Sequence, residues 1–349
     1  MHHRHRRFCR RAFLALLCAA GFAVSAPLSP AAAQDANMPL KGETVRIYVG
    51  FSPGGGYDAY ARMLAPYFEK KTGATVVVEN RPGGDGLTAL NQLVREKPDG
   101  LAMMMLNGES AIMAQLTKKP GVAFDMTKVS NLGRVALEQH FVVVNPNMPD
   151  KLQDIIASGK PVKFSATGRT DNLGDYAAVL CETLKMNCQI ITGYKGSKEA
   201  GLAVLNGEVD AIAISDGSGN KIAQGGKAKV IATIGTQRSE LKPDMPTVYE
   251  QFKLTPDQKW LMDFRLAIKD YGRVMVAPPD MPADKLKYLQ KVWREILTDP
   301  VLMEEGAKTE RALSYQPPDK LEKTTRDLLQ SLPPDKLEKV NEVILKKFS

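Results

Sequence analysis

Short apolar runs alternate with helical patterns along most of this chain. The apolar run 45–49 leads through the glycines at 54–56 into a segment whose apolar residues recur every three or four positions, as far as Phe68. Pro66 lies inside that segment, where we expect it to kink or shorten the helix. A strand, a second glycine-rich loop and a helix are predicted over 75–94, and the apolar run 101–106 reads as a third strand. This repeated order predicts a doubly wound α/β sheet with parallel strands.

A second α/β series starts at the apolar run 141–146. Its further strands are predicted at 162–167, 189–194, 209–214 and 229–234, with helices between them. The run 273–279 is predicted to be a strand that returns to the first series. Proline at a first helical turn favours helix initiation, so we expect helices starting near Pro282, Pro300, Pro318 and Pro334. The chain is therefore predicted to fold into two α/β domains.

The first 33 residues have the pattern of a cleaved export signal. Arginines precede an apolar run at 12–24, and the small residues Ala31, Ala32 and Ala33 follow it. The apolar run is too short to span a bilayer. Arg10 and Arg11 leave the twin-arginine route open beside ordinary secretion. In either case we expect an exported protein that begins near residue 34.

Removal of this signal changes the charge and the residues available for chemistry. The whole chain has a formal net charge of +8, but five arginines leave with the signal, so 42 basic residues face 39 acidic ones and the net charge falls to +3. The basic balance is thus no argument for nucleic-acid binding. Of the four histidines only His140 remains. We therefore expect no metal site and no cofactor.

Two cysteines, Cys181 and Cys188, remain in the exported chain. An even pair in an oxidising compartment favours a disulfide. The six residues between them read as a helix end and a turn, which would allow the bond. Two buried free thiols are the alternative.

The loop at 52–58 is the first candidate for chemistry. Glycines let the backbone approach a ligand closely, and the first N–H groups of the following helix point outward with the positive end of the helix dipole. The loop is therefore predicted to hold an anion. The nucleotide-binding spacing Gly-x-Gly-x-x-Gly is missing, and no Gly-x-Ser-x-Gly elbow surrounds Ser165, which with His140 would be needed for a hydrolase. We expect no enzyme activity.

Several motifs resemble the Bug family, the extracytoplasmic substrate-binding receptors of tripartite tricarboxylate transporters. In chain order they are Tyr48 to Asp58, Val78 to Gly83, Pro98-Asp99-Gly100, Gly193 to Gly196, Asn206 to Asp210, Pro243 to Thr247 and Val276-Ala277-Pro278. The resemblance covers nearly the whole exported chain. It implies a type II periplasmic-binding-protein fold, with two lobes joined by crossing strands that close on a small carboxylate. Lobe I would comprise 34–140 and 235–349, and lobe II 141–234.

The resemblance also implies which loops bind the ligand. One carboxylate would lie between the first glycine loop and the facing loop of lobe II, with a third segment nearby. The candidate ligand-binding residues are Ser52, Pro53, Gly54, Gly55, Gly56, Tyr57, Asp58, Ser165, Ala166, Thr167, Gly168, Arg169, Thr170, Tyr194 and Lys195. Amides of the glycines and the hydroxyls of Ser165 and Thr167 could surround an oxyanion without a buried counter-charge.

Two of these residues have open roles. Arg169 could pair with a second, distal carboxylate, or it could point to solvent or pair with Asp171. Asp58 could orient the glycine loop as a helix cap, or contact the ligand. The polar segment from Thr255 to Asp270, which precedes Tyr271-Gly272, departs from the family pattern and leaves the lid in that region undefined.

The sequence thus predicts a monomeric periplasmic receptor that delivers a small carboxylate to membrane permease subunits. The resemblance leaves dicarboxylates, tricarboxylates, amino acids and aromatic carboxylates open as ligands. A sensory receptor with the same fold, which reports occupancy to a signalling protein, is the alternative. A periplasmic hydrolase is a distant one.

Overall fold

The computed structural model describes residues 39–330 and 332–348. The predicted export signal lies outside these residues. From Leu40 onward the chain forms one unit that contains two five-stranded sheets, which we call sheet A and sheet B.

Sheet A has the strand order β2-β1-β3-β10-β4. Its strands are β1 (Thr44–Val49), β2 (Thr75–Asn80), β3 (Ala102–Asn107), β4 (Ser130–Ala136) and β10 (Arg273–Ala277). Strands β1, β2 and β3 are parallel, whereas β10 runs antiparallel to both of its neighbours. The predicted return of the run 273–279 to the first sheet is confirmed.

Sheet B has the order β7-β6-β8-β5-β9. Its strands are β5 (His140–Val144), β6 (Val162–Ser165), β7 (Cys188–Ile191), β8 (Ala211–Ser215) and β9 (Lys229–Ile234). Here β5 is the antiparallel strand, between β8 and β9. Each sheet therefore contains one strand reached by a crossing of the chain, and the predicted fold of two α/β lobes joined by crossing strands is confirmed.

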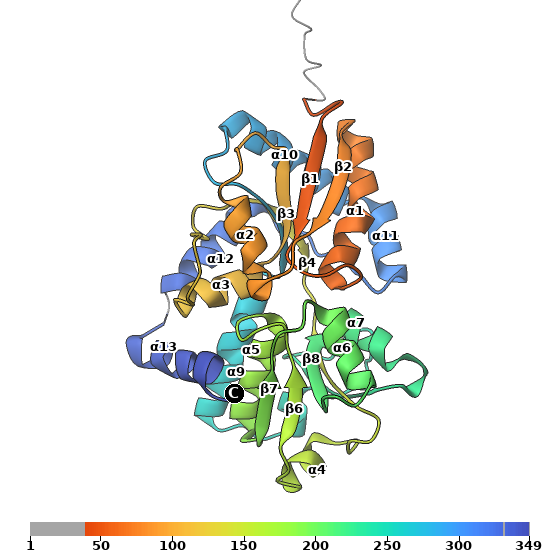
Figure 1. Cartoon of the computed structure of the whole chain (residues 1–349), viewed down its shortest axis with the longest axis vertical. Helices are drawn as coiled ribbons and strands as arrows, with labels where there is room; N and C mark the ends of the chain where they lie inside the picture. The colour runs from red at the N-terminus through yellow and green to blue at the C-terminus, as the bar shows by residue number, and fades with distance from the viewer. Residues whose placement is uncertain (1–38, 331, 349) are drawn as a thin grey trace, which may run out of the picture. The chain divides into compact units, whose positions relative to one another are not determined.

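Helices cover both sheets (Figure 1). Those before β5 are α1 (Gly56–Thr72), the short 3₁₀ helix η1 (Gly84–Gly86), α2 (Leu87–Leu93) and α3 (Gly108–Leu116). Between β5 and β9 lie α4 (Leu152–Ala157), α5 (Asn172–Leu184), α6 (Ser197–Leu205), α7 (Asp216–Ala223) and η2 (Gln224–Gly226). After β9 come α8 (Val248–Gln251), α9 (Pro256–Lys269), α10 (Ala283–Leu297), α11 (Pro300–Lys308), α12 (Pro318–Gln330), α13 (Pro334–Asn341) and η3 (Glu342–Lys346).

The four proline-led helices near the C-terminus are confirmed. Helices α11, α12 and α13 begin at the predicted prolines, and Pro282 is the N-cap of α10. Pro66, by contrast, does not shorten α1, which runs 17 residues through it. The proline is exposed, so the carbonyl that it leaves without an intrahelical partner can bond to water.

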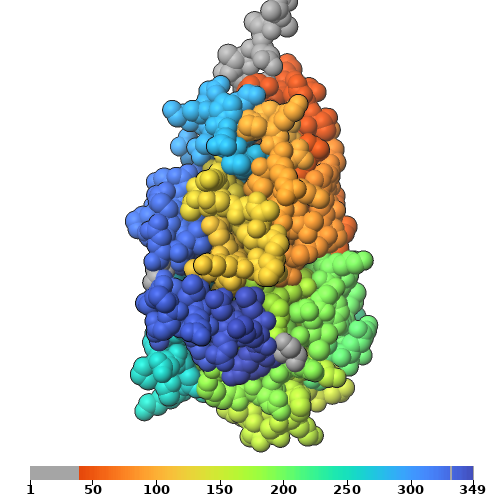
Figure 2. Space-filling model, turned by 60° about the vertical axis from the view of Figure 1, so that its left-hand side comes forward, coloured from red at the N-terminus to blue at the C-terminus, as the bar shows by residue number. Residues whose placement is uncertain are grey.

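The polar segment before Tyr271 folds into α9. Thr255 caps it in a capping box with Gln258, and the helix packs on α5 and on α3. The C-terminal η3 also packs on α5, and Figure 2 shows this last part of the chain in dark blue beside the green elements of sheet B. Parts of the chain after β9 therefore contact helices of sheet B as well as those of sheet A.

One apolar cluster is continuous from one face of sheet A to sheet B, and a second covers the other face of sheet A. Trp293 of α10 is fully buried and stacks on Phe68 of α1, with ring centroids 5.0 Å apart. Within the part of the chain that the structure describes, we find no helix long and apolar enough to cross a membrane.

Candidate functional site

A cavity of about 40 Å³ lies between the strand ends of sheet A and sheet B. We call it the intersheet cavity; its lining residues are Phe51, Gly55, Gly56, Tyr57, Asn107, His140, Thr167, Asp171, Asn172, Leu173, Ser197, Ile214, Ser215 and Arg273. Most of them come from the carboxyl ends of β1, β3, β6 and β8 and from the segments that follow. This is the edge at which open α/β sheets bind ligands.

The two antiparallel strands contribute one residue each through their register. Arg273, the first residue of β10, pairs with Asn107 at the end of β3. His140, the first residue of β5, pairs with Ser215 at the end of β8. Antiparallel pairing brings the start of one strand to the end of its neighbour, so both residues reach the cavity edge.

The first glycine loop is held in place by Asp58. Its Oδ2 accepts a hydrogen bond from the Gly54 amide at 2.8 Å, and its Oδ1 accepts one from Arg62 Nε at 2.9 Å. Burial opposes the charge of Asp58, but these bonds lower its pKa. Asp58 is therefore turned toward its own loop, and Gly55 becomes the N-cap of α1 at the cavity wall.

Arg273 places a buried cation beside this loop. The residue is 6% exposed, its Nε donates to Glu138, and its Nη2 donates to Ser215 Oγ at 3.2 Å. The guanidinium carbon lies 3.9 Å from the centroid of the Tyr57 ring. Nη1 is buried and has no hydrogen-bond partner among the described residues. Arg273, one of whose donors is unused, is thus a lining residue of the cavity.

His140 lines the cavity as a neutral group. Burial lowers its pKa well below the usual value, and the charges of Arg265, Lys269 and Arg273 lower it further. The ring stacks on Tyr176 with centroids 4.0 Å apart, and Nδ1 has no partner among the described residues. His140 can therefore offer a neutral hydrogen-bonding group.

Asp171 is the N-cap of α5 on the opposite wall. Its Oδ1 accepts from the Gly174 amide at 3.0 Å, and its Oδ2 accepts from the Thr167 hydroxyl. Burial, together with the nearby charge of Asp85, raises the pKa of Asp171 to about 7, although these hydrogen bonds oppose the shift. The N-terminus of α5 thus already has a carboxylate of the protein itself.

Four of the predicted ligand-binding residues line the intersheet cavity: Gly55, Gly56, Tyr57 and Thr167. The structure places the others elsewhere. Gly54 borders a shallower hollow beside Lys198, and Pro53 is exposed. The buried Ser165 hydroxyl donates to the Ala200 carbonyl at 2.9 Å, and the Thr167 hydroxyl is used by Asp171. The expectation that these two hydroxyls face an oxyanion does not fit this geometry.

The remaining predicted residues make structural contacts. The amide of Ser52 donates to the Lys195 carbonyl at 2.9 Å, and the amide of the buried Ala166 donates to the Ile191 carbonyl at 2.9 Å. Tyr194 is half-buried and packs against the apolar core.

Gly168 and Thr170 contact Asp85 of η1 instead of the cavity. The amide of Thr170 donates to Asp85 Oδ2 at 3.3 Å, and its hydroxyl donates to the same atom at 3.1 Å. A Cβ added at Gly168 would lie 1.4 Å from Asp85 Oδ1. Lys119 forms an ion pair with Asp85. The loop between β6 and α5 is therefore joined by hydrogen bonds to Asp85 on the sheet A side, a contact that was not predicted from the sequence.

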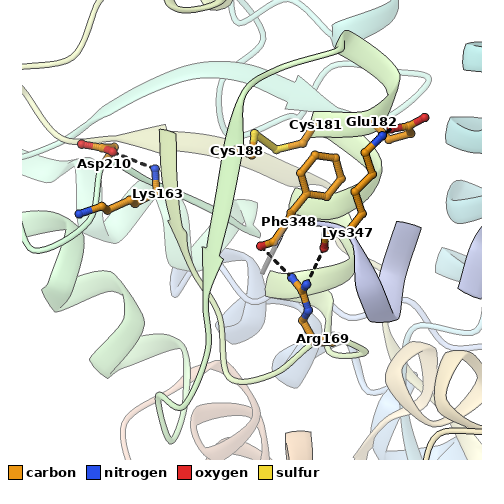
Figure 3. The surroundings of a disulfide bond; sticks show 8 residues. All are labelled: Lys163, Arg169, Cys181, Glu182, Cys188, Asp210, Lys347 and Phe348. Atoms are coloured by element: carbon orange, nitrogen blue, oxygen red, sulfur yellow. Dashed lines mark hydrogen bonds and ion pairs between the residues drawn. A yellow bond between two sulfur atoms is a disulfide. The ribbon is translucent and has the colours of Figure 1, made fainter. Parts of the chain in front are cut away.

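Arg169 lies on the C-terminal tail (Figure 3). Its Nη1 donates to the Phe348 carbonyl at 3.3 Å, and its Nη2 donates to the Lys347 carbonyl. This is neither of the arrangements considered from the sequence. Nearby, Cys181 and Cys188 are joined in a disulfide that links the end of α5 to the start of β7.

Most cavity residues outside the glycine loop were missed from the sequence. Arg273 directly precedes an apolar run, and a charged residue at the start of a buried strand is the sequence feature that could have indicated it. Asn107 and Ser215 are the last residues of buried strands, where polar side chains commonly reach a ligand. Ser197 begins α6, directly after the predicted segment around Lys195.

Two α/β sheets that meet at a polar cavity between their strand ends define a two-lobed solute-binding protein of the periplasmic type. The family model described as tripartite tricarboxylate transporter family receptor matches residues 60–329, so the chain belongs to this family. Its members are periplasmic receptors for solutes and not enzymes. The resemblance seen in the sequence motifs is confirmed.

Individual relatives agree with this assignment. Protein BugT of Bordetella pertussis is 27% identical over 224 residues, which are 61% of this chain and 68% of BugT. The structure of the periplasmic binding protein BugD is similar with a TM-score of 0.72 and 22% identity, covering 86% of this chain and 97% of BugD. MatC from Rhodopseudomonas palustris, solved with bound malate, has a TM-score of 0.69 and 18% identity, covering 86% of this chain and 99% of MatC.

Proposed function

We propose that this protein captures a small organic carboxylate in the intersheet cavity and delivers it to membrane permease subunits of a tripartite tricarboxylate-type transporter. It would act in the periplasm after removal of residues 1–33, with 34–140 plus 235–349 as lobe I and 141–234 as lobe II. The observation that carries the proposal is the meeting of the α1 N-terminus and the buried Arg273 at one cavity wall. Family membership and the malate bound to MatC support it.

The physical basis is anion binding at a helix N-terminus. The first amides of a helix lack intrahelical partners and carry the positive end of the dipole. Gly55 and Gly56 leave these amides accessible because they have no side chain. A Cβ at Gly55 would lie 3.1 Å from Ser197 Oγ, and a Cβ at Gly56 would lie 3.1 Å from Arg273 Nη2, so a side chain at either position would crowd the cavity wall. Capture would consist of docking on this wall followed by approach of the sheet B loops.

A thermal-shift screen of the purified exported protein against carboxylates, sugars and cations tests the proposal. A ligand at 100 times its dissociation constant adds about 2.7 kcal/mol to the free energy of unfolding, which gives a clear rise in melting temperature. We expect a rise with at least one carboxylate. A rise with a sugar or a cation and with no carboxylate would contradict the proposal.

The site can be located with Gly55→Val. The added side chain should block docking on the α1 N-terminus and remove the ligand-induced shift. Ala65→Val, farther along the same helix, is the matched control and should keep the shift. Uptake of the identified ligand by cells with and without the receptor then separates transport from a sensory role.

A further inference from the structure

The sheet A wall and the sheet B wall of the intersheet cavity differ in whether their hydrogen-bonding groups already have partners within the protein. On the sheet A side, Arg273 keeps an unpartnered, buried Nη1, and its guanidinium lies against Gly56 at the start of α1. Helix α1 is 17 residues long, and the Gly56 amide has only a long contact of 3.4 Å to Ser197 Oγ. Two separate features, a helix N-terminus and a charged side chain, therefore point to the same place for an anion.

The sheet B side has its own acidic group in place. Asp171 accepts hydrogen bonds from Gly174 and Thr167. Among the described residues that line the cavity on this side, we find no cation. They are His140, Thr167, Asp171, Asn172, Leu173, Ser197, Ile214 and Ser215. A carboxylate placed there would face Asp171 without a compensating charge, which is costly in a buried site.

The charge of Glu138 beside Arg273 limits how many carboxylates this wall can bind to one. Glu138, 12% exposed at its side chain, already pairs with Arg273. The pair is therefore close to neutral, and the extra attraction available to a ligand comes from the free Nη1 and the helix dipole. Such a site suits one carboxylate, with hydroxyl or amide groups at the other end to meet Asn172 and His140.

We propose, on the basis of the proposed function, that the ligand is a monocarboxylate with a neutral polar far end. Its carboxylate lies on Arg273 Nη1 and the first amides of α1, and its far end lies toward α5. Arg273 thus receives the carboxylate, and Asp171 on the opposite wall selects against a second one.

Matched pairs of ligands test the proposal, because each pair differs by one carboxylate. Dissociation constants are measured by calorimetry for succinamate against succinate and for 3-hydroxypropionate against malonate, in which an amide or a hydroxyl replaces the second carboxylate. We expect the monocarboxylate of each pair to bind about 10-fold or more tightly than its partner. Tighter binding of succinate or malonate would overturn the substrate class while leaving carboxylate capture intact. Binding of no carboxylate would overturn the proposed function itself.

Variants of Arg273 test the role of its side chain. Arg273→Met alone leaves Glu138 buried without its partner, so the double variant Arg273→Met/Glu138→Gln keeps the pair neutral and guards against misfolding. We expect the double variant to melt cooperatively and to bind the monocarboxylate about 10-fold or more weakly, the effect of one lost charged hydrogen bond. Arg46→Met is the control, because Arg46 of β1 lies outside the cavity and also pairs with a glutamate, Glu96. Unchanged affinity in both Arg273→Met and Arg273→Met/Glu138→Gln would show that Arg273 does not receive the ligand.

Discussion

At the scale of single residues, the contact between Gly168 and Asp85 determines how closely the loop after β6 approaches sheet A. Asp85 has a positive φ of 63°, in the left-handed region, and its carboxylate lies over the Gly168 backbone. Only a glycine leaves room for it. The carboxylate then accepts both hydrogen bonds of Thr170.

Gly168→Ala should therefore weaken ligand binding. The added methyl group would overlap Asp85, and the loss of one charged hydrogen bond corresponds to a loss of affinity of about 10-fold or more. The dissociation constant of the identified ligand measures the effect. The double variant Asp85→Gly/Gly168→Ala removes the overlap and should bind as Asp85→Gly does. An unchanged affinity of Gly168→Ala would mean that this contact is not needed for capture.

Asp171 gives a prediction for pH. Its pKa is about 7 in the folded protein, raised mainly by burial and also by Asp85, whereas an unfolded aspartate titrates near 3.9. Between these values the folded state binds more protons than the unfolded state, so this residue makes stability fall as pH rises from about 4 to 7. Hydrogen bonds from Thr167, Gly168 and Gly174 oppose the shift but do not cancel it.

Asp171→Asn should remove that fall while keeping a good N-cap. Melting temperatures of the two proteins, measured from pH 4 to 8, should diverge in favour of the variant as pH rises and stay parallel above pH 7. Parallel curves across the whole range would contradict the raised pKa.

At the scale of elements, the C-terminal tail acts as an extra edge for sheet B. The amide of Ile190 in β7 donates to the Phe348 carbonyl at 2.8 Å, and Arg169 donates to the carbonyls of Lys347 and Phe348. The loop that precedes α5 is thereby linked to a segment about 180 residues later in the chain. Arg169 serves this link, which is why it does not reach the cavity.

Arg169→Ala should accordingly affect stability more than binding. Loss of hydrogen bonds from a charged donor should lower the free energy of unfolding by about 1–2 kcal/mol. Denaturant unfolding measures this, with the exposed Arg326→Ala as a control that should change by less than about 0.5 kcal/mol. Ligand affinity should stay within about twofold of the wild type. A large loss of affinity with unchanged stability would restore Arg169 as a ligand contact.

The disulfide is a second link between elements of the same region. Cys181 and Cys188 are seven positions apart, so the bond closes a short loop. In the chain-entropy model a loop of this size contributes about 2–3 kcal/mol to the free energy of unfolding. The double variant Cys181→Ala/Cys188→Ala should be less stable by about that amount. Reductant should destabilise the wild type to the same degree and leave the variant unchanged; no effect of reductant on the wild type would indicate two free thiols.

At the scale of the whole molecule, the sequence predicted the layers better than the contacts between them. Periodicity located the strands of both sheets apart from β4, and the apolar run after Gly272 indicated the crossing strand β10. These features follow from local patterns of burial. The sequence also located the glycine loop at the cavity wall, because its glycines have a function that no other residue can provide.

What the sequence could not supply depends on pairing across the chain. Arg273 reaches the cavity only because β10 runs antiparallel to β3 with Arg273 opposite Asn107. Asp85 meets Gly168 only once two separately formed sheets face each other. Likewise Ser165, plausible as a ligand contact by position, points to Ala200 of a neighbouring helix. Register and side-chain direction of this kind are set by tertiary packing.

The hydrogen bonds that join the two sheets at Ser52–Lys195 and Asp85–Thr170 have a kinetic consequence. Their donors and acceptors belong to the protein alone, so they join the two sheets whether or not the cavity is filled. A ligand must then wait for these bonds to open before it enters the cavity. We expect the observed association rate to level off at high ligand concentration, at a plateau equal to the opening rate of the receptor.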